Sequence, residues 1–160
     1  MRRARIESSG ASLPKWWRRR GSVGHAVAAG RRCLAASRHR PADVGVLVNA
    51  GVYRDDHVVE PANAAYIQHR LGVNVEFQGR PTLSFDLLNG GCGMLNAAQV
   101  VCALLQASEV EAGLVVSGEA NGDRRPDPAS AVARSGAALL LDLSPRPESG
   151  FGAFAFRTRE

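Results

Sequence analysis

The 160-residue chain contains few cysteines, and they are not spaced for disulfides or metals. There are three, an odd number, and no CxxC pair or Cys/His metal spacing occurs. We therefore expect neither a disulfide framework nor a metal site. A chain with unpaired thiols also fits a reducing compartment, so the expected location is the cytoplasm.

Long apolar runs are also missing. The start, MRRAR, is basic but leads into no apolar core of signal-peptide length, and no later run approaches membrane-spanning length. The sequence therefore predicts a soluble, unexported protein with no membrane partner.

No nucleic-acid-binding motif is recognisable, although the net charge is +5. Most of the positive charge lies in residues 2–40, with Trp16 and Trp17 beside it. Such a block could contact nucleic acid, an acidic carrier protein or the phosphates of coenzyme A. A solvated arginine-rich surface with no specific partner is the favoured interpretation. Without a motif, nucleic acid is the disfavoured partner.

Length and composition predict one compact core. At 45% hydrophobic residues, the chain can bury a single core but not two catalytic domains. The composition divides it into a basic strand and loop over residues 1–21 and one domain over residues 22–160.

The first half of the chain alternates predicted strands with predicted helices. Short apolar runs between turn residues predict strands, and apolar spacing of three to four predicts helices. The expected strands cover 5–9, ended by Gly10, and 44–48; the expected helices cover 22–37, capped by Ser22, and 62–71, closed by Gly72. A polar loop, 49–61, follows the second strand, and loops at strand ends often carry function in α/β proteins.

The second half adds a strand, a helix and further strands. Residues 82–88 predict a strand with Phe85, Asp86 and Leu87 in the centre of the sheet, and a largely buried helix follows Cys92. Three more strands are expected over 114–117, 136–143 and 152–157. The order predicts an α/β fold with a layered, mixed sheet and covering helices.

Cys92 is the candidate nucleophile. It lies between Gly90-Gly91 and the predicted helix, and a helix N-terminus favours the thiolate form. A thiolate there could attack a thioester. The alternative is a small packed residue in a glycine-rich turn. A hydrolase elbow is disfavoured, since Met94 replaces its second glycine.

Four segments carry a family resemblance. They are VGVLVNAGVYRDDHVVEPANAAYIQHRLG at 44–72, LSFDLLNGGCGMLNAAQVV at 83–101, AGLVVSGEA at 112–120 and SGAALLLDLS at 135–144. Together they resemble the N-terminal half of the thiolase superfamily, above all the β-ketoacyl-acyl carrier protein synthase III and long-chain acyl condensing enzymes.

This resemblance implies a thiolase-like fold and an acyltransferase of fatty acid or polyketide biosynthesis. The implied chemistry is cysteine-dependent acyl transfer or condensation on coenzyme A or acyl carrier protein thioesters, with no bound cofactor. Such enzymes have two similar halves, and the second holds a catalytic histidine and asparagine. The implied partner is therefore a second copy or a separately encoded half. The alternative is a non-catalytic partner or truncated remnant.

The resemblance leaves the nucleophile position open. Family members commonly place the cysteine five residues after the strand aspartate and two before a glycine. Cys92 lies six after Asp86 and directly before Gly93, so Gly91 aligns with the nucleophile. Either the turn is rebuilt to present Cys92, or the site is inactive, because glycine cannot form an acyl-enzyme.

Glu60 is the second candidate catalytic residue. The Glu60-Pro61 pair resembles the pair that opens the corresponding helix in long-chain condensing enzymes, where the glutamate acts as a base. The alternative is a glutamate that favours a helix N-terminus electrostatically. The stretch 14–22 is shorter than the family segment that lines the coenzyme A tunnel, so cofactor-binding residues stay unassigned. His25, His39, His57 and His69 match no catalytic position.

Overall fold

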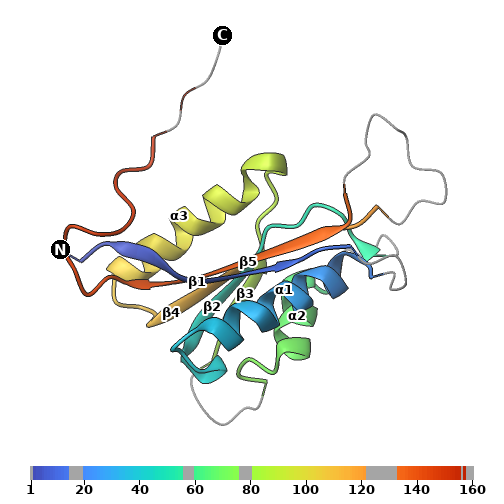
Figure 1. Cartoon of the computed structure of the whole chain (residues 1–160), viewed down its shortest axis with the longest axis horizontal. Coiled ribbons are helices and arrows are strands. Elements are labelled where there is room, and N and C mark those ends of the chain that lie inside the picture. The colour runs from blue at the N-terminus through green and yellow to red at the C-terminus, as the bar shows by residue number, and fades with distance from the viewer. Residues whose placement is uncertain are drawn as a thin grey trace.

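The computed structural model describes residues 2–14, 20–55, 60–75, 81–121, 133–155 and 157. Five strands form one mixed sheet in the order β1-β5-β4-β2-β3 (Figure 1). The strands are β1 (Ala4–Ser12), β2 (Val44–Asn49), β3 (Leu83–Asp86), β4 (Ala112–Glu119) and β5 (Ser135–Leu143). The three middle strands of the chain run parallel, whereas β5 is antiparallel to both β4 and β1. The expected mixed, layered α/β sheet is confirmed.

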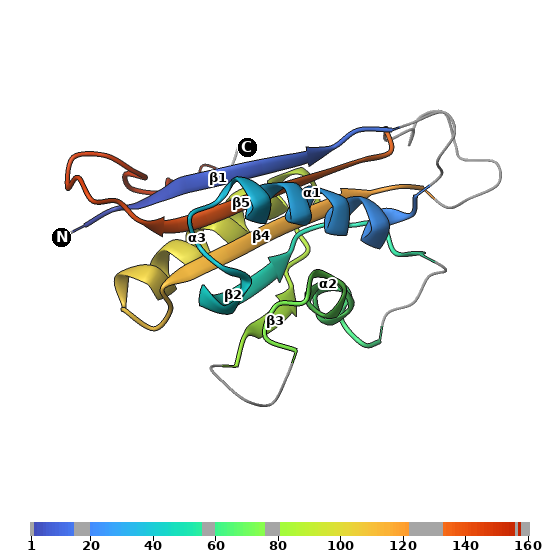
Figure 2. The same cartoon turned by 60° about the horizontal axis from the view of Figure 1, so that its bottom comes forward.

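Helices cover both faces of this sheet. The helices α1 (Ser22–Ala36) and α2 (Asn63–Leu71) lie on one face, and α3 (Gly93–Gln106) lies on the other (Figure 2). Two short 3-10 turns, η1 (Pro41–Asp43) and η3 (Gly90–Cys92), precede β2 and α3. No helix among the described residues is both long and apolar enough to span a bilayer.

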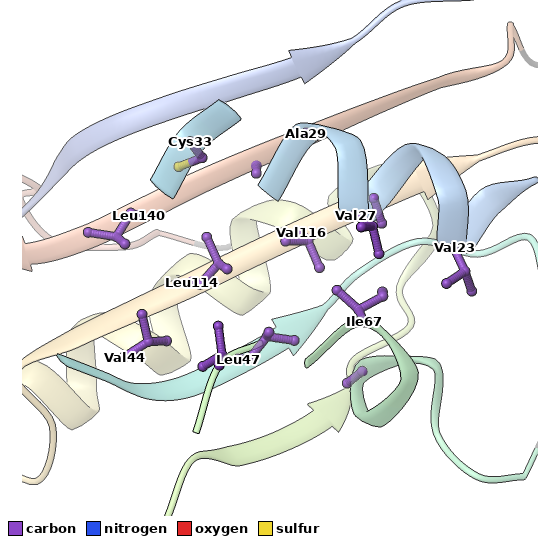
Figure 3. Close-up of a cluster of buried hydrophobic side chains, with 14 of the residues drawn as sticks. Val23, Val27, Ala29, Cys33, Val44, Leu47, Ile67, Leu114, Val116 and Leu140 are labelled. Carbon is purple, nitrogen blue, oxygen red and sulfur yellow. The ribbon is translucent and has the colours of Figure 1, made fainter. Parts of the chain in front are cut away.

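Each face has its own apolar cluster. Under α1 and α2, Val27 and Ile67 pack with β-strand residues such as Leu47 and Leu114 (Figure 3). Under α3, Val101 and Leu105 pack with side chains from the opposite face of β2, β4 and β5. The continuous apolar run of β2 therefore reflects burial on both faces, as in other parallel sheets.

Glycine allows β1 and α1 to approach closely. A Cβ on Gly10 would lie 2.3 Å from the Ala29 carbonyl oxygen and 2.5 Å from the Cys33 amide nitrogen. The strand therefore continues through Gly10 to Ser12, and the expectation that Gly10 ends it is wrong. At the end of α2, Gly72 adopts the left-handed conformation with φ 70°, which confirms it as the C-terminal cap.

Two further expectations are wrong. The strand containing Phe85 and Asp86 lies at the edge of the described sheet, where β2 is its one neighbour. A strand was also expected over 152–157, but its described residues, 152–155 and 157, have no regular structure. Phe151 instead donates its N–H to the Ala4 carbonyl and packs against the apolar cluster under α3.

Candidate functional site

Polar residues gather at the carboxyl edge of the three parallel strands. Asn49 ends β2, Asp86 ends β3 and Glu119 ends β4. In α/β sheets this edge is where ligand sites usually lie. Here, the three side chains mainly hold the surrounding loops and helices in place.

Asp86 connects β2, the following loop and α2. Its carboxylate accepts hydrogen bonds from the amide of Asn49 at 3.1 Å and from the guanidinium of Arg54 at 2.8 Å. It also accepts the backbone N–H groups of Asn63 and Ala64 at 3.0 and 2.8 Å, so it caps the start of α2. The Nη1 atom of Arg54 is buried and has no partner among the described residues.

Two other carboxylates hold the loop after β2. Glu119 accepts the N–H groups of Val52 and Tyr53. Asp55 accepts the N–H groups of Ser22 and Val23 at 2.6 and 3.1 Å, and it therefore caps α1. The expected cap, the Ser22 side chain, instead donates to the Ala120 carbonyl. Sequence reasoning missed this role of Asp55 because the two partners lie more than thirty residues apart.

The turn that carries Cys92 is fastened on both sides. The Asn89 amide donates to the Asn96 side chain at 2.6 Å, which ties the start of the turn to the first turns of α3. The N–H of Cys92 donates to the Asn89 carbonyl at 3.0 Å, and Gly90 has φ 48°. Cys92 is the residue directly before α3, and it is exposed.

Gly93 brings this turn to the end of β2. A Cβ at Gly93 would lie 3.1 Å from the Ala50 carbonyl oxygen, so a glycine lets α3 begin close to the backbone after β2. By contrast, nothing lies within 4 Å of a Cβ built on Gly91. Both Gly91 and Cys92 face open space, and the assignment of the nucleophile position stays a prediction.

The other two cysteines are buried. Burial raises the pKa of the Cys33 thiol, an effect partly offset by hydrogen bonds with Ser8 and the Leu140 backbone. Burial raises the pKa of the Cys102 thiol to about 11. Of the three thiols, Cys92 alone is exposed.

Glu60 lies on the surface just before α2. Among the described residues, no hydrogen bond or ion pair joins Glu60 to Cys92. Residues 56–59 of the same loop, including His57, lie outside the described residues. The catalytic roles of Cys92 and Glu60 therefore stay predictions.

Two of the described histidines, His25 and His39, contact side chains that hold the fold together. His25 is 2% exposed, and its Nδ1 lies 3.0 Å from the Ser12 hydroxyl. Burial lowers the pKa of His25. His39 contacts the carboxylate of Asp142, and His69 lies exposed on α2.

Part of the basic block also has a structural role. Asp142 is 2% exposed, and Arg5, Arg38 and His39 all contact its carboxylate. The side chain of Arg32 donates to the Ala11 carbonyl. Trp16 and Trp17 lie outside the described residues. Within the described part of the chain, no group of three histidine, cysteine or acidic residues could hold a metal ion.

Comparison with known sequences finds two related enzymes, although no model of a known protein family matches the chain. An acyl-CoA:acyl-CoA alkyltransferase of Shewanella oneidensis is 29% identical over 116 residues, which are 72% of this chain and 31% of that protein. The enzyme of the same name from Xanthomonas campestris pv. campestris is 29% identical over 94 residues, 59% of this chain and 26% of that protein. The chain thus matches about a third of each relative's length or less.

Comparison with solved structures identifies the fold. A cysteine-to-serine variant of Xanthomonas campestris OleA, crystallised with lauric acid and lauroyl-CoA, matches 88% of this chain with a TM-score of 0.73 and 16% identity. A glutamate-to-alanine variant of the same protein matches 89% with a TM-score of 0.74. The match covers 56% of each OleA chain. The chain therefore has the thiolase-like fold of the N-terminal half of OleA, a long-chain condensing enzyme of the thiolase superfamily.

Proposed function

We propose that the chain is the nucleophile-bearing half of a cysteine-dependent enzyme that transfers or condenses acyl groups from coenzyme A or acyl carrier protein thioesters. The observation that carries the proposal is the exposed Cys92, fastened before α3 at the carboxyl edge of the sheet, in a fold shared with OleA. The ligands bound in that OleA structure, lauric acid and lauroyl-CoA, favour a long-chain acyl-CoA as the first substrate to test.

The proposed first step is acyl transfer to Cys92. Its thiolate attacks the thioester carbonyl carbon, a new S–C bond forms, and the bond to the coenzyme A sulfur breaks. Coenzyme A leaves as a thiolate and takes up a proton. Cys92 lies directly before α3 and is exposed, so its sulfur is open to a substrate. A condensation would follow if Glu60 removed a proton from the second acyl substrate.

The turn limits which groups can stabilise the oxyanion. The N–H groups of Cys92 and Gly93 already donate to the carbonyls of Asn89 and Gly90. In this proposal, the remaining donors come from the first turn of α3 or from a second chain. The second chain is either another copy or a separately encoded half. Only a separately encoded half could supply the histidine and asparagine that the resemblance implies, because none of the four histidines of this sequence matches a catalytic position.

A non-catalytic partner is the second candidate. It is favoured by the glycine at the aligned nucleophile position and by the absence of a described hydrogen bond between Cys92 and Glu60. In this case the fold would stabilise a complex without forming an acyl-enzyme.

Mass spectrometry separates the two candidates. The protein is incubated with lauroyl-CoA, and the intact mass and the modified peptide are measured. We expect one lauroyl group on the peptide of Cys92, no adduct on a Cys92→Ala variant and an unchanged adduct on a Cys102→Ala variant. Absence of the adduct, also when a candidate second half is supplied, would leave the non-catalytic function.

A further inference from the structure

Glu60 owes its place to the loop around it. Residues 50–62 join β2 to α2, and we call them the β2–α2 loop. Within the described part of the chain, no hydrogen bond or ion pair holds the Glu60 side chain itself. The position of this carboxylate is therefore set by the contacts that fasten the loop on either side of it.

The carboxylate of Asp86 fastens this loop at three points. At the start, the side-chain amide of Asn49 donates to it at 3.1 Å, and within the loop the guanidinium of Arg54 donates at 2.8 Å. At the end, the backbone N–H groups of Asn63 and Ala64 donate at 3.0 and 2.8 Å. One side chain on β3 thus holds both ends and the middle of the β2–α2 loop.

Burial and charge make this attachment firm. The Asp86 and Arg54 side chains are 9% and 16% exposed, so water and salt screen their contact little. Hydrogen bonds to an ionised carboxylate are also shorter and stronger than those between neutral groups. Because the carboxylate accepts donors from a strand, a loop and a helix at once, it holds these three elements in one arrangement.

Asp86 also lies on the strand that leads to Cys92. It ends β3, six residues before Cys92, and α2 lies beside this strand (Figure 2). The next residue, Leu87, donates its N–H to the Asn49 carbonyl at 2.9 Å. The same short segment therefore carries the candidate nucleophile at one end and holds the loop of the candidate base at the other.

We propose that Asp86 is the positioning residue of Glu60: it keeps the β2–α2 loop attached to β3, so that Glu60 holds one place relative to the Cys92 turn. A misplaced catalytic group loses much of its effect, because the reaction needs a defined geometry. This inference rests on the proposed function, in which Glu60 is the base. It adds the side chain that sets the position of that base and acts through it.

The distance between two spin labels tests this placement without any substrate. In the full chain, one nitroxide is attached to the exposed Cys92 and one to a Glu60→Cys variant, while Cys33 and Cys102 stay buried and unlabelled. Pulsed electron paramagnetic resonance then gives the distribution of distances between the labels. We expect one narrow distribution, and one at least about twofold wider when Asp86→Asn is added, because the amide replaces an acceptor oxygen with a donor.

Arg54 and α1 provide the matched variants. Arg54→Met should also widen the distribution, whereas Arg54→Lys should keep it narrow, because lysine can still donate a hydrogen bond to Asp86. The control pair has its second label at Ala35→Cys, on the exposed side of α1, and its distribution should not change with Asp86→Asn. Circular dichroism should show every variant folded.

Kinetics with acyl substrates add a second readout. Asp86→Asn should lower kcat for condensation by at least about tenfold and leave KM within about twofold, since Asp86 affects the placement of the base rather than substrate binding. A purely structural role of Asp86 would lower the free energy of unfolding without this difference between kcat and KM.

Three results would overturn the proposal. One is an equally narrow distribution with Asp86→Asn and with Arg54→Met. Another is equal widening of the control pair, which would show a general loosening of the fold. The third is a widened distribution with an unchanged kcat. If Asp86→Asn does not fold, the two Arg54 variants decide. Because the distance measurement uses no acyl substrate, it decides the placement of Glu60 independently of whether Cys92 is acylated.

Discussion

The guanidinium of Arg54 donates a 2.8 Å hydrogen bond to the carboxylate of Asp86, and both side chains are largely buried, at 16% and 9% exposure. The same carboxylate caps α2 through two backbone N–H groups. One side chain thus holds a loop, a strand end and a helix start at the edge that carries the candidate site.

Removal of the Asp86 carboxylate should destabilise the fold strongly. Asp86→Ala leaves a buried guanidinium and two helix N–H groups without their acceptor, so we expect about 3 kcal/mol lower free energy of unfolding. Urea denaturation measures this loss. Asp43→Ala is the comparison. Asp43 pairs with Arg40 on the surface, so its removal should lower the free energy of unfolding by less. Equal losses would show that burial does not strengthen the Arg54–Asp86 contact.

Cys92 should be the first thiol to react with iodoacetamide. It is exposed, whereas Cys33 and Cys102 are buried and their pKa values are raised. The thiolate is the reacting form, so the native protein should take up one label on the peptide of Cys92. A folded Cys92→Ala variant should resist labelling until denaturant is added. Rapid labelling of Cys102 in the native protein would contradict the packing of α3.

A side chain at Gly10 should disrupt the contact between β1 and α1. Gly10→Ala places a methyl group against backbone atoms of α1 that cannot rotate away. We expect a loss of about 1–3 kcal/mol in the free energy of unfolding. Gly91→Ala is the matched control, since nothing lies near its Cβ, and its thermal midpoint should stay close to that of the unchanged protein.

Acidification should destabilise the protein through His25. Its pKa is lowered in the folded state, chiefly by burial, from the ordinary value of 6.5. The unfolded chain therefore binds the proton more readily, and stability falls as the pH drops from about 6.5 towards the lowered pKa. Above about pH 6.5, His25 is neutral in both states, and its contribution to the free energy of unfolding is fully present.

Urea denaturation at about pH 7.5 and at about pH 5.5 measures whether the free energy of unfolding falls on acidification. We expect the fall in unfolding free energy to be smaller for His25→Asn than for the unchanged protein. His69→Asn is the comparison variant, because it makes the same substitution at an exposed position on α2. A steeper fall in His25→Asn would contradict the neutral, buried imidazole.

Local sequence signals predicted the elements that depend on neighbouring residues. The apolar run at Val44–Asn49, the left-handed cap at Gly72 and the helix after Cys92 all follow from short-range patterns. The α/β class followed from the order of these elements, whereas the thiolase-like resemblance rested on the four quoted segments.

Features that depend on distant residues were not predictable in the same way. The edge position of β3 is decided by which strands pair, and the run around Phe85 resembles a central strand when taken alone. A glycine such as Gly10 locally resembles a strand end, because the close backbone of α1 that requires a glycine there lies in another segment. Cys92 was found from its turn, but the Asn89–Asn96 hydrogen bond that fastens the turn has no distinctive local motif.

The pairing of β1 with β5 also constrains the order of folding during synthesis. Ala4 pairs with Leu143, and among the described strands β5 alone borders β1. During translation, β1 is therefore synthesised long before β5, and it stays unpaired until β5 has been synthesised. The parallel strands β2, β3 and β4 can pair earlier. The strand that is synthesised first, β1, therefore joins the sheet last. Such long-range closure is slow, and it leaves the apolar residues of β1 open to chaperones during translation.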